Sequence, residues 1–276
     1  MGLTSAQLDV VDLTPRIGSE IRTDLETLLG GSEAANIRAT LERRGVVFFR
    51  GIKISDEHQV AVAKTLGNIV QNEGESGIYK ISLDKNINQR AEYLKGSMFW
   101  HFDGSLQPYP NLATLLRAVK LSDTGGDTEF CNTYAAYEDL PQADKDLIAD
   151  LRVVHSAERS QYYVRPEMSY AEIAFWQKSP TKVCPLVWTH RSGRKSLLLG
   201  ATADYVVGLP VEESRALLAR LRDWATQPHY VYRHKWQAGD LLIWDNTGTM
   251  HRVLEYPVDS GRLMHRTILA GEEPLQ

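Results

Sequence analysis

The sequence predicts a mainly β protein with helical cover, an α+β fold around a β-barrel core, and two observations support this prediction. From Tyr79 onward, short apolar runs alternate with Gly, Pro, Asn and Asp, which is typical of the strands of a sandwich or barrel. Two longer stretches of helical periodicity interrupt these runs and indicate helices packed on the barrel. The 276 residues show no repeat and no low-complexity linker, so we expect a single domain over residues 1–276.

The chain opens with two predicted helices that flank one buried strand. The strand is GVVFFRG (45–51), an apolar run bounded by glycines. Ser55, followed by two acidic residues, is typical of the capped start of the second helix. The apolar positions at helical spacing are Ala34, Ile37 and Leu41 in residues 32–44, and Val60, Val62, Ala63 and Leu66 after Ser55.

Eight further runs predict strands, and residues 135–149 and 210–226 predict helices between them. Residues 159–180 fit neither a strand nor a clean helix, and their many aromatic side chains argue against disorder, so we predict a lid there. The eight strand sequences are YKISLD, ATLLRAV, DTEFCNT, PLVWTH, SLLLG, HYVYRHKW, DLLIWDN and RTILAG.

Composition and charge narrow the class of function. The net charge of −4 provides no basic surplus for a phosphate backbone, so we expect no nucleic-acid partner. Cys131 and Cys184 are far apart and are predicted to be buried thiols. No window approaches the roughly 18 apolar residues of a membrane span, so we expect no membrane partner. A cytoplasmic homo-oligomer is the expected state.

His101 and Asp103 are the first candidate metal ligands. They lie two residues apart, and on a strand this spacing places both side chains on one face, where an imidazole nitrogen and a carboxylate oxygen converge. The alternative is a surface hydrogen bond, because the His-x-Asp pattern also occurs by chance.

His251 is the second candidate histidine. It follows the strand DLLIW and a polar turn at 245–248, and we expect the next strand to begin at the histidine, at the mouth of the barrel. Two histidines and one carboxylate suit non-haem Fe(II), because they leave coordination positions open. A closed zinc site needs four protein ligands, and neither histidine has a cysteine nearby. Surface or packing roles are expected for the other six histidines.

Arg262 and Arg266 are candidates for binding anions. Their separation of four residues places them on one face of a strand together with Met264. A guanidinium inside an apolar barrel is costly unless an anion meets it, and its planar fork matches a carboxylate. The alternative is a pair of solvated arginines on the outer face.

Taken together, these residues resemble the taurine dioxygenase and 2,4-dichlorophenoxyacetate dioxygenase family of Fe(II)- and 2-oxoglutarate-dependent oxygenases. The likeness extends from about Gly45 to Gly271, and the order and spacing of the motifs support it. The motifs are GVVFFRG, His101-x-Asp103, GGDTEF, WDNTGTMHR and RLMHRTILAG, with Arg262 eleven residues after His251.

The resemblance implies a double-stranded β-helix (jelly roll) with Fe(II) held by the catalytic residues His101, Asp103 and His251. It further implies that Arg262 and Thr128 bind the distal carboxylate of 2-oxoglutarate, and that Arg266 binds the anionic group of the substrate. O2 and 2-oxoglutarate would then be consumed, with release of succinate and CO2. The presence of Asp103 favours hydroxylation over halogenation.

For the substrate we expect a small organic anion, and we prefer a carboxylate with an apolar or aromatic body, including aryloxyalkanoates that are cleaved at the ether. In the family, the segments before the first metal histidine contribute pocket residues, here 73–79 and 95–97, with Tyr79 and Ser97 as the candidates. Phe99, Leu106 and Tyr109 are available for the apolar body. The alternatives are a sulfonate or alkyl sulfate dioxygenase, a zinc hydrolase on the same barrel, and a non-catalytic jelly-roll binding protein.

Overall fold

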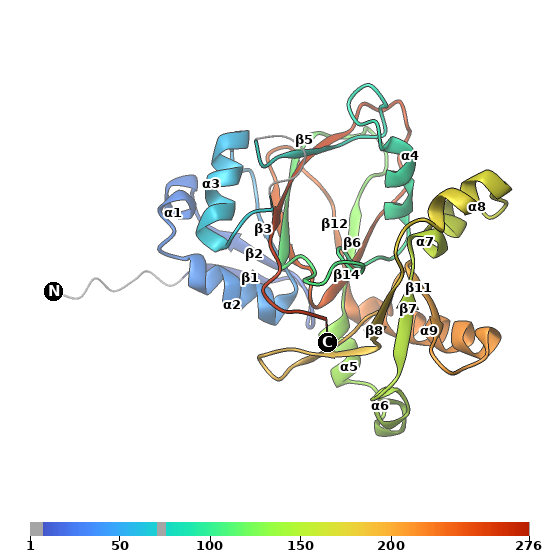
Figure 1. Cartoon of the computed structure of the whole chain (residues 1–276). Helices are drawn as coiled ribbons and strands as arrows, with labels where there is room; N and C mark the ends of the chain where they lie inside the picture. Colours follow the sequence, from blue (N-terminus) through green and yellow to red (C-terminus); the bar gives the residue numbers. More distant parts are fainter. Residues whose placement is uncertain (1–7, 71–75, 276) are drawn as a thin grey trace.

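The computed structural model describes residues 8–70 and 76–275, and its centre is a pair of facing β-sheets (Figure 1). Among the described residues, the larger sheet has seven strands in the order β1-β2-β3-β13-β5-β15-β4, and the smaller has three in the order β12-β6-β14. Phe48, Phe130 and Trp244 belong to the apolar core between the two sheets. This architecture confirms the predicted jelly roll. The strand bounds are Asp9–Asp12 (β1), Ser19–Arg22 (β2), Val46–Phe49 (β3), Tyr79–Ile81 (β4), Ala113–Lys120 (β5), Thr128–Asn132 (β6), Val231–His234 (β12), Leu241–Asp245 (β13), Thr249–Val253 (β14) and Leu263–Leu269 (β15).

Strand β3 is buried on both faces, as the apolar run GVVFFRG predicted. Val46 and Phe48 point into the jelly roll, whereas Val47 and Phe49 pack against the N-terminal helices. Because successive side chains of a strand point to opposite faces, a strand covered on both sides requires an apolar residue at every position.

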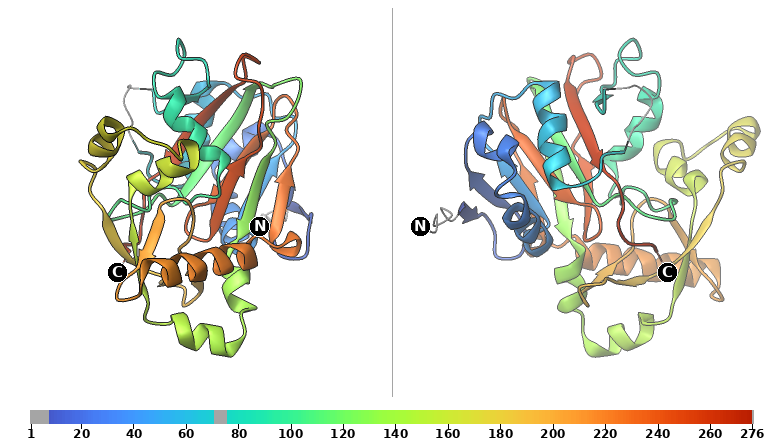
Figure 2. Two further views of the ribbon diagram at one scale, coloured as in Figure 1. Left: turned by 90° about the vertical axis from the view of Figure 1, so that its right-hand side faces the viewer. Right: turned by 60° about the vertical axis from the view of Figure 1, so that its left-hand side comes forward.

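The helices α1 (Leu25–Gly30), α2 (Ala34–Arg44) and α3 (Asp56–Leu66) cover the outer face of the larger sheet (Figure 2, right). Ser55 caps α3 as predicted, since its Oγ accepts a hydrogen bond from the backbone N–H of His58 at 3.2 Å. One position differs from the prediction: Gln59, which is fully buried, takes a place on the inner face of α3, and Val60 is only half-buried. Gln59 donates to the backbone carbonyl of His265 at 3.0 Å and so connects α3 to β15.

A second layer lies below the jelly roll in Figure 1 and has its own apolar core. Cys131 and Cys184 are both buried and free, which confirms the predicted thiols. The elements of this layer and of the connections to it are α5 (Thr133–Glu138), α6 (Gln142–Ile148), α9 (Val211–Ala225), η2 (Pro228–Tyr230), β7 (Arg152–His155), β8 (Lys182–Pro185), β9 (Val187–Thr189), β10 (Lys195–Leu197) and β11 (Ala203–Val206).

Two helix predictions differ from the structure. The helix expected over 135–149 is the pair α5 and α6, and Pro141 stands at the start of the second because proline has no N–H to continue the first. The segment 159–180, expected to be irregular, is largely helical: it contains most of α7 (Ala157–Val164) and all of α8 (Tyr170–Trp176). Ser156 and Ser169 cap these two helices. These N-cap serines indicate helix starts, but the prediction relied on the aromatic residues instead.

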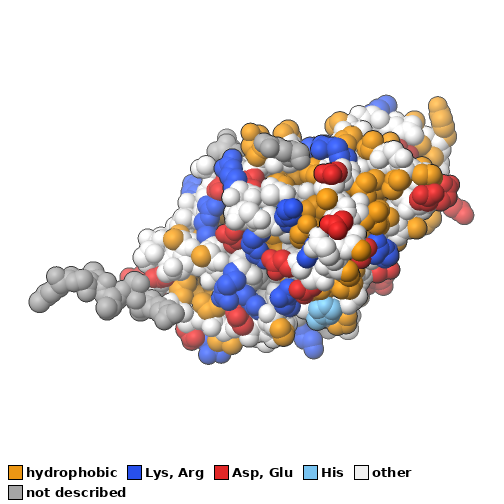
Figure 3. All heavy atoms as spheres, turned by 90° about the horizontal axis from the view of Figure 1, so that it is seen from below, with side chains coloured by type: hydrophobic (Ala, Val, Ile, Leu, Met, Phe, Trp, Pro, Cys, Tyr) orange, Lys and Arg blue, Asp and Glu red, His pale blue; other side chains and the backbone are white. Residues whose placement is uncertain are grey.

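Charged side chains of both signs are interspersed on the face of the molecule shown in Figure 3. Elsewhere in the structure, charged side chains form ion pairs near the surface, such as Arg220 with Asp144 at 2.8 Å and Arg194 with Glu138 at 2.9 Å. Such pairs contribute little stability but keep the surface polar. No helix within the described ranges is long and apolar enough to cross a membrane.

Asp245 at the end of β13 leads to a prediction about stability. Burial raises the pKa of its carboxyl to about 6, although Thr247 donates two hydrogen bonds to it, from its N–H at 2.7 Å and its hydroxyl at 2.6 Å. The folded protein therefore holds a proton that the unfolded chain releases near pH 4, so this group lowers stability as the pH rises from about 4 to 6. Asp245→Asn should raise the free energy of unfolding at pH 8 by about 1–3 kcal/mol and leave it little changed at pH 4. Urea titrations at both pH values measure this, and an equal effect at pH 4 and pH 8 would contradict the raised pKa.

Candidate metal centre and co-substrate pocket

His101 and His251 come from distant parts of the chain, and backbone pairing brings them together. Each backbone N–H donates to the carbonyl oxygen of the other residue at 3.0 Å, and their rings lie side by side with centroids 4.1 Å apart. Gly200 permits this approach, because a Cβ at this position would lie 3.1 Å from the Cα of His101, and its φ of +110° is unfavourable for other residues.

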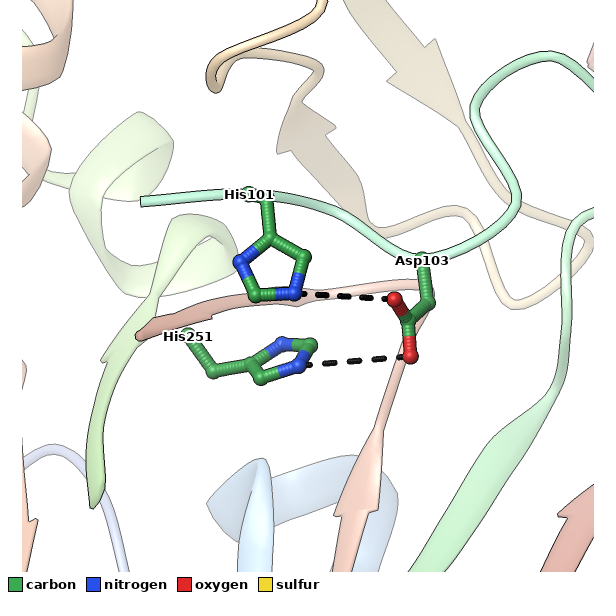
Figure 4. A group of neighbouring side chains, drawn as sticks. All are labelled: His101, Asp103 and His251. Carbon is green, nitrogen blue, oxygen red and sulfur yellow. Dashed lines mark ion pairs between the residues drawn. The ribbon is translucent and has the colours of Figure 1, made fainter. Parts of the chain in front are cut away.

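Asp103 completes a cluster of three side chains that point toward one another (Figure 4). Its Oδ1 lies 3.7 Å from His101 Nε2, and its Oδ2 lies 3.9 Å from His251 Nε2. One potential ligand atom from each of the three residues lies within 4.8 Å of the others. The structure thus brings together the three residues that the sequence predicted.

The protonation of this cluster suits a cation. His101 Nδ1 lies 2.9 Å from the carbonyl oxygen of Phe99, which can only accept, so in the neutral ring Nδ1 carries the proton and Nε2 presents its lone pair toward Asp103. Burial lowers the pKa of His251 well below its ordinary value, so this ring is neutral. Burial favours the protonated form of Asp103, but the positive charge of the neighbouring Arg266 helps to keep the pKa of its carboxyl below the ordinary value.

Two details of the predicted cluster need correction. His101 and Asp103 do not lie on a regular strand: His101 forms an isolated bridge with His251, and Asp103 lies in the following turn. Strand β14 begins at Thr249, two residues before His251, so the histidine lies inside the strand. His251 is packed there against Trp244 and Phe130, with ring centroids at 4.6 and 5.9 Å.

The cluster opens into a cavity of about 440 Å³, and Arg262 lines one part of it. Arg262 is 4% exposed, and burial lowers the pKa of its guanidinium. Its Nη2 donates to the backbone carbonyl of Gly126 at 3.1 Å and its Cζ lies 4.7 Å from the ring centre of Tyr256, but no carboxylate of the described residues pairs with it. A buried cation without a counter-ion is costly, so the cavity is suited to an anion at this point.

Two residues of the motif GGDTEF, Gly126 and Thr128, lie beside Arg262 or in the same cavity. A Cβ at Gly126 would lie 2.9 Å from Arg262 Nε, so only glycine leaves room for the guanidinium. Thr128 lines the same cavity, since it pairs with Val253, which lies on the same face of β14 as His251. Arg262 and Thr128 therefore share the cavity with the three-residue cluster.

Arg266 also lines the cavity, closer to the cluster. Its Nη1 lies 3.8 Å from Asp103 Oδ2, and its Cζ lies 4.9 Å from the ring centre of Tyr79. Met264 lines the cavity between the two arginines, whereas His265 points to the opposite side and pairs with Asp56 at 2.7 Å. The alternation predicted for this strand is confirmed.

Of the other residues predicted to contact the substrate, only some line the cavity. Tyr79, Ser97 and Leu106 line the cavity, and the Ser97 hydroxyl donates to the backbone carbonyl of Leu94 at 2.6 Å. Phe99 and Tyr109 are not among its lining residues: Phe99 packs against Tyr163 outside it, and Tyr109 is 53% exposed. Positions 73–75 of the expected segment lie outside the described residues.

Several cavity residues were missed by sequence reasoning. Arg90 and Tyr93 line the cavity from the segment around α4 (Ala91–Leu94), which precedes η1 (Lys95–Met98). Ser105 and Thr202 hydrogen-bond each other at 3.0 Å, although they lie far apart in the chain. From the predicted lid, only the polar Ser160 and Gln161 reach the cavity, so its aromatic residues do not line it directly. No motif marks these positions, because the fold alone brings them together.

Comparisons with known proteins agree with this site. A family model described as "Taurine catabolism dioxygenase TauD, TfdA family" matches residues 9–268. The α-ketoglutarate-dependent 2,4-dichlorophenoxyacetate dioxygenase of Cupriavidus pinatubonensis is 38% identical over 261 residues, which cover 88% of this chain and 90% of the relative. The α-ketoglutarate-dependent sulfate ester dioxygenase of Pseudomonas putida is 34% identical over 282 residues, which cover 98% of this chain and 91% of the relative.

The fold has equally clear relatives. A crystal structure of AAD-2 in complex with Mn(II) and N-oxalylglycine superposes with a TM-score of 0.84 at 33% identity and covers 98% of this chain and 100% of that one. N-Oxalylglycine is a 2-oxoglutarate analogue. The prediction of an enzyme that uses Fe(II), 2-oxoglutarate and O2 is thereby confirmed, in preference to a zinc hydrolase or a binding protein. The chain belongs to the TauD, TfdA family and is an Fe(II)- and 2-oxoglutarate-dependent dioxygenase.

Proposed function

We propose that this dioxygenase oxidises a small organic acid whose anionic group binds Arg266 beside the metal. The observation that supports the proposal is the position of this arginine: it lines the cavity 3.8 Å from Asp103, and its buried Nε has no hydrogen-bond partner among the described residues. A guanidinium that retains unused donors next to the reacting centre is suited to orient a carboxylate.

His101, Asp103 and His251 are the proposed Fe(II) ligands. Two imidazoles face the carboxylate of Asp103, whose Oδ2 finds no hydrogen-bond donor in the described parts of the chain. This donor set fits a divalent cation that keeps open positions for other ligands. The Phe99 carbonyl, which accepts from His101 Nδ1, would hold that ring in the tautomer that binds metal.

Arg262 and Thr128 are the proposed anchors for the distal carboxylate of 2-oxoglutarate. Arg262 supplies a buried charge that lacks a counter-ion, and Thr128 supplies a hydroxyl in the same cavity. When bound, Fe(II) activates O2 in a reaction that converts 2-oxoglutarate to succinate and CO2 and oxidises the substrate. The protein residues orient the two organic acids at separate guanidiniums and exclude water from the cavity.

For the body of the substrate we propose an apolar or aromatic group, with aryloxyalkanoates as the first class to test. Tyr79, Tyr93 and Leu106 offer apolar surface around Arg266, and Ser97 lies nearby in the same cavity. Similarity to a 2,4-dichlorophenoxyacetate dioxygenase supports an aryloxy acid, whereas similarity to a sulfate ester dioxygenase supports alkyl sulfates as the second candidate.

A panel of aryloxyacetates, aryloxypropionates, alkyl sulfates, sulfonates and amino acids tests this proposal through substrate-dependent succinate release. We expect the highest kcat/KM with an aryloxy acid, together with release of the corresponding phenol. Turnover of alkyl sulfates alone would favour the second candidate, and succinate release that no acid stimulates would contradict both.

We also propose that the chain forms a single domain and that residues 159–180 act as a lid over its cavity. Ser160 and Gln161 line the cavity, and Trp176 of α8 stacks on Tyr93 with ring centroids 6.0 Å apart. The aromatic residues of the segment thus support the cavity wall indirectly.

The cytoplasmic location and the homo-oligomer remain predictions. Light scattering after gel filtration tests the oligomeric state.

Arg266→Ala should weaken binding of the substrate by about 30-fold or more, because truncating one partner of a buried charge pair costs roughly 2–5 kcal/mol. The affinity for 2-oxoglutarate should change little, since Arg262 is intact. Anaerobic titrations of the Fe(II) protein with each acid separate the two effects. Arg252→Ala is the control, because Arg252 pairs with Glu129 at 2.7 Å and does not line the cavity. If only the binding of 2-oxoglutarate is lost, Arg266 does not bind the substrate.

A further inference from the structure

Trp236 makes a single polar contact with the proposed co-substrate site. Its indole Nε1 lies 2.9 Å from the hydroxyl oxygen of Thr128. Trp236 belongs to the loop between β12 and β13, and it does not line the cavity itself. Trp236 also packs against the apolar core between the sheets, so Thr128 is its polar but not its sole connection to the cavity.

The direction of this hydrogen bond is fixed by chemistry. An indole N–H only donates, so the Thr128 oxygen must accept. The hydroxyl proton then has to point elsewhere, and the described residues place no acceptor within hydrogen-bond distance of it. Thr128 is 4% exposed and lines the cavity, so its proton is left to be donated into the cavity.

A buried network holds the indole in this position. The ring of His234 meets Trp236 edge-on, with centroids 4.5 Å apart, and His234 pairs with Thr128 across the sheet. His234 Nε2 donates to Asp240 at 3.0 Å, and Tyr232 donates its hydroxyl proton to His234 Nδ1 at 2.9 Å. His234 and Asp240 are fully buried, so the orientation of this ring, and of the indole against it, is determined by the core.

We propose that Trp236 is a positioning residue that makes the Thr128 hydroxyl a dedicated donor to the distal carboxylate of the co-substrate. The inference rests on the proposed role of Thr128. In a free hydroxyl, the proton rotates among several acceptors. Here the indole N–H already donates to the Thr128 oxygen, so the hydroxyl proton is directed into the cavity before the carboxylate binds. Less rotational freedom of the hydroxyl is therefore lost on binding.

The test compares two ligands of the Mn(II) protein by calorimetry: N-oxalylglycine, which has a distal carboxylate, and oxalate, which lacks one. Trp236→Phe should lower the affinity for N-oxalylglycine about three- to tenfold, the range expected for the loss of one neutral hydrogen bond. The affinity for oxalate should stay unchanged, because oxalate does not reach Thr128. A merely structural role would weaken both ligands alike.

Trp224→Phe is the matched control. Trp224 also donates through Nε1, here to the backbone carbonyl of Ala136 at 2.8 Å, but it lies on α9 and does not line the cavity. The same substitution therefore removes an indole hydrogen bond without touching the site, and both affinities should be retained. Melting temperatures of the two variants show whether the fold is equally preserved.

The double variant decides whether the effect passes through Thr128. Thr128→Val should lower the affinity for N-oxalylglycine, and the double variant Thr128→Val/Trp236→Phe should bind this ligand no more weakly than Thr128→Val alone. If Thr128→Val weakens this ligand and Trp236→Phe does not, the inference is wrong and the proposed site stands. Full additivity of the two substitutions also overturns the inference. If Thr128→Val has no effect, the proposed role of Thr128 is wrong and the inference falls with it.

Discussion

His251→Ala is expected to abolish succinate release, even with Fe(II) in excess. The variant leaves one imidazole and one carboxylate, and the cluster depends on three donor atoms within 4.8 Å of one another. The lost ring is also the centre of local packing, because it contacts Trp244, Phe130 and His101. The expected loss in turnover is about 1,000-fold or more, since removal of a metal ligand affects both metal affinity and open-site geometry.

The control for this variant is His190→Ala. His190 is 6% exposed, against 7% for His251, but it bonds Ser196 at 2.8 Å and lies outside the cavity. Both variants lose a buried imidazole, so both should lose some thermal stability. Only His251→Ala should lose Mn(II) binding in a calorimetric titration. Near-normal turnover of the His251 variant would remove this residue from the proposed metal site.

The strands and the metal cluster were predictable because each leaves a local signal. Strand β3 is apolar at every position, and the inward residues of β15 alternate with outward ones, so their patterns show which faces are buried. The chemistry of the side chains and the resemblance both suggested that His101 and His251 bind one metal, but their backbone pairing was not predicted, since 149 residues lie between the two. Nothing near either histidine specifies the backbone bridge between them.

The missed features depend on contacts between distant segments. Strands β1, β7, β8 and β11 have only four residues each and contain charged or polar side chains, so no apolar run marks them. In α8 the aromatic residues that suggested a lid remain exposed, with Tyr170 at 86% and Phe175 at 60%, so they do not form a periodic buried face. Trp236 lies in a loop, and its contact with Thr128 exists only because β12 pairs with β6.

Arg262→Ala should raise the KM for 2-oxoglutarate by about 30-fold or more while the fold is retained, because the variant removes the proposed partner of the distal carboxylate at a cost of roughly 2–5 kcal/mol. The substrate affinity should change little, which is the reverse of the result expected for Arg266→Ala. The KM of Arg262→Lys for 2-oxoglutarate should lie between those of the wild type and Arg262→Ala, because an ammonium keeps the charge but not the planar fork. A change in KM of less than about threefold would place the anchor elsewhere.

Stability without ligand provides a second, independent readout for the same residue. In the free protein, Arg262 is a buried cation that no carboxylate of the described residues neutralises, and burial lowers its pKa. Removing such an uncompensated charge relieves a desolvation cost, so the free Arg262→Ala protein should melt no lower than the wild type. Adding 2-oxoglutarate with Mn(II) should raise the melting temperature of the wild type by mass action but scarcely that of the variant. A variant that melts lower without ligand, yet is stabilised as much as the wild type by 2-oxoglutarate, would show that Arg262 supports the fold and not the co-substrate.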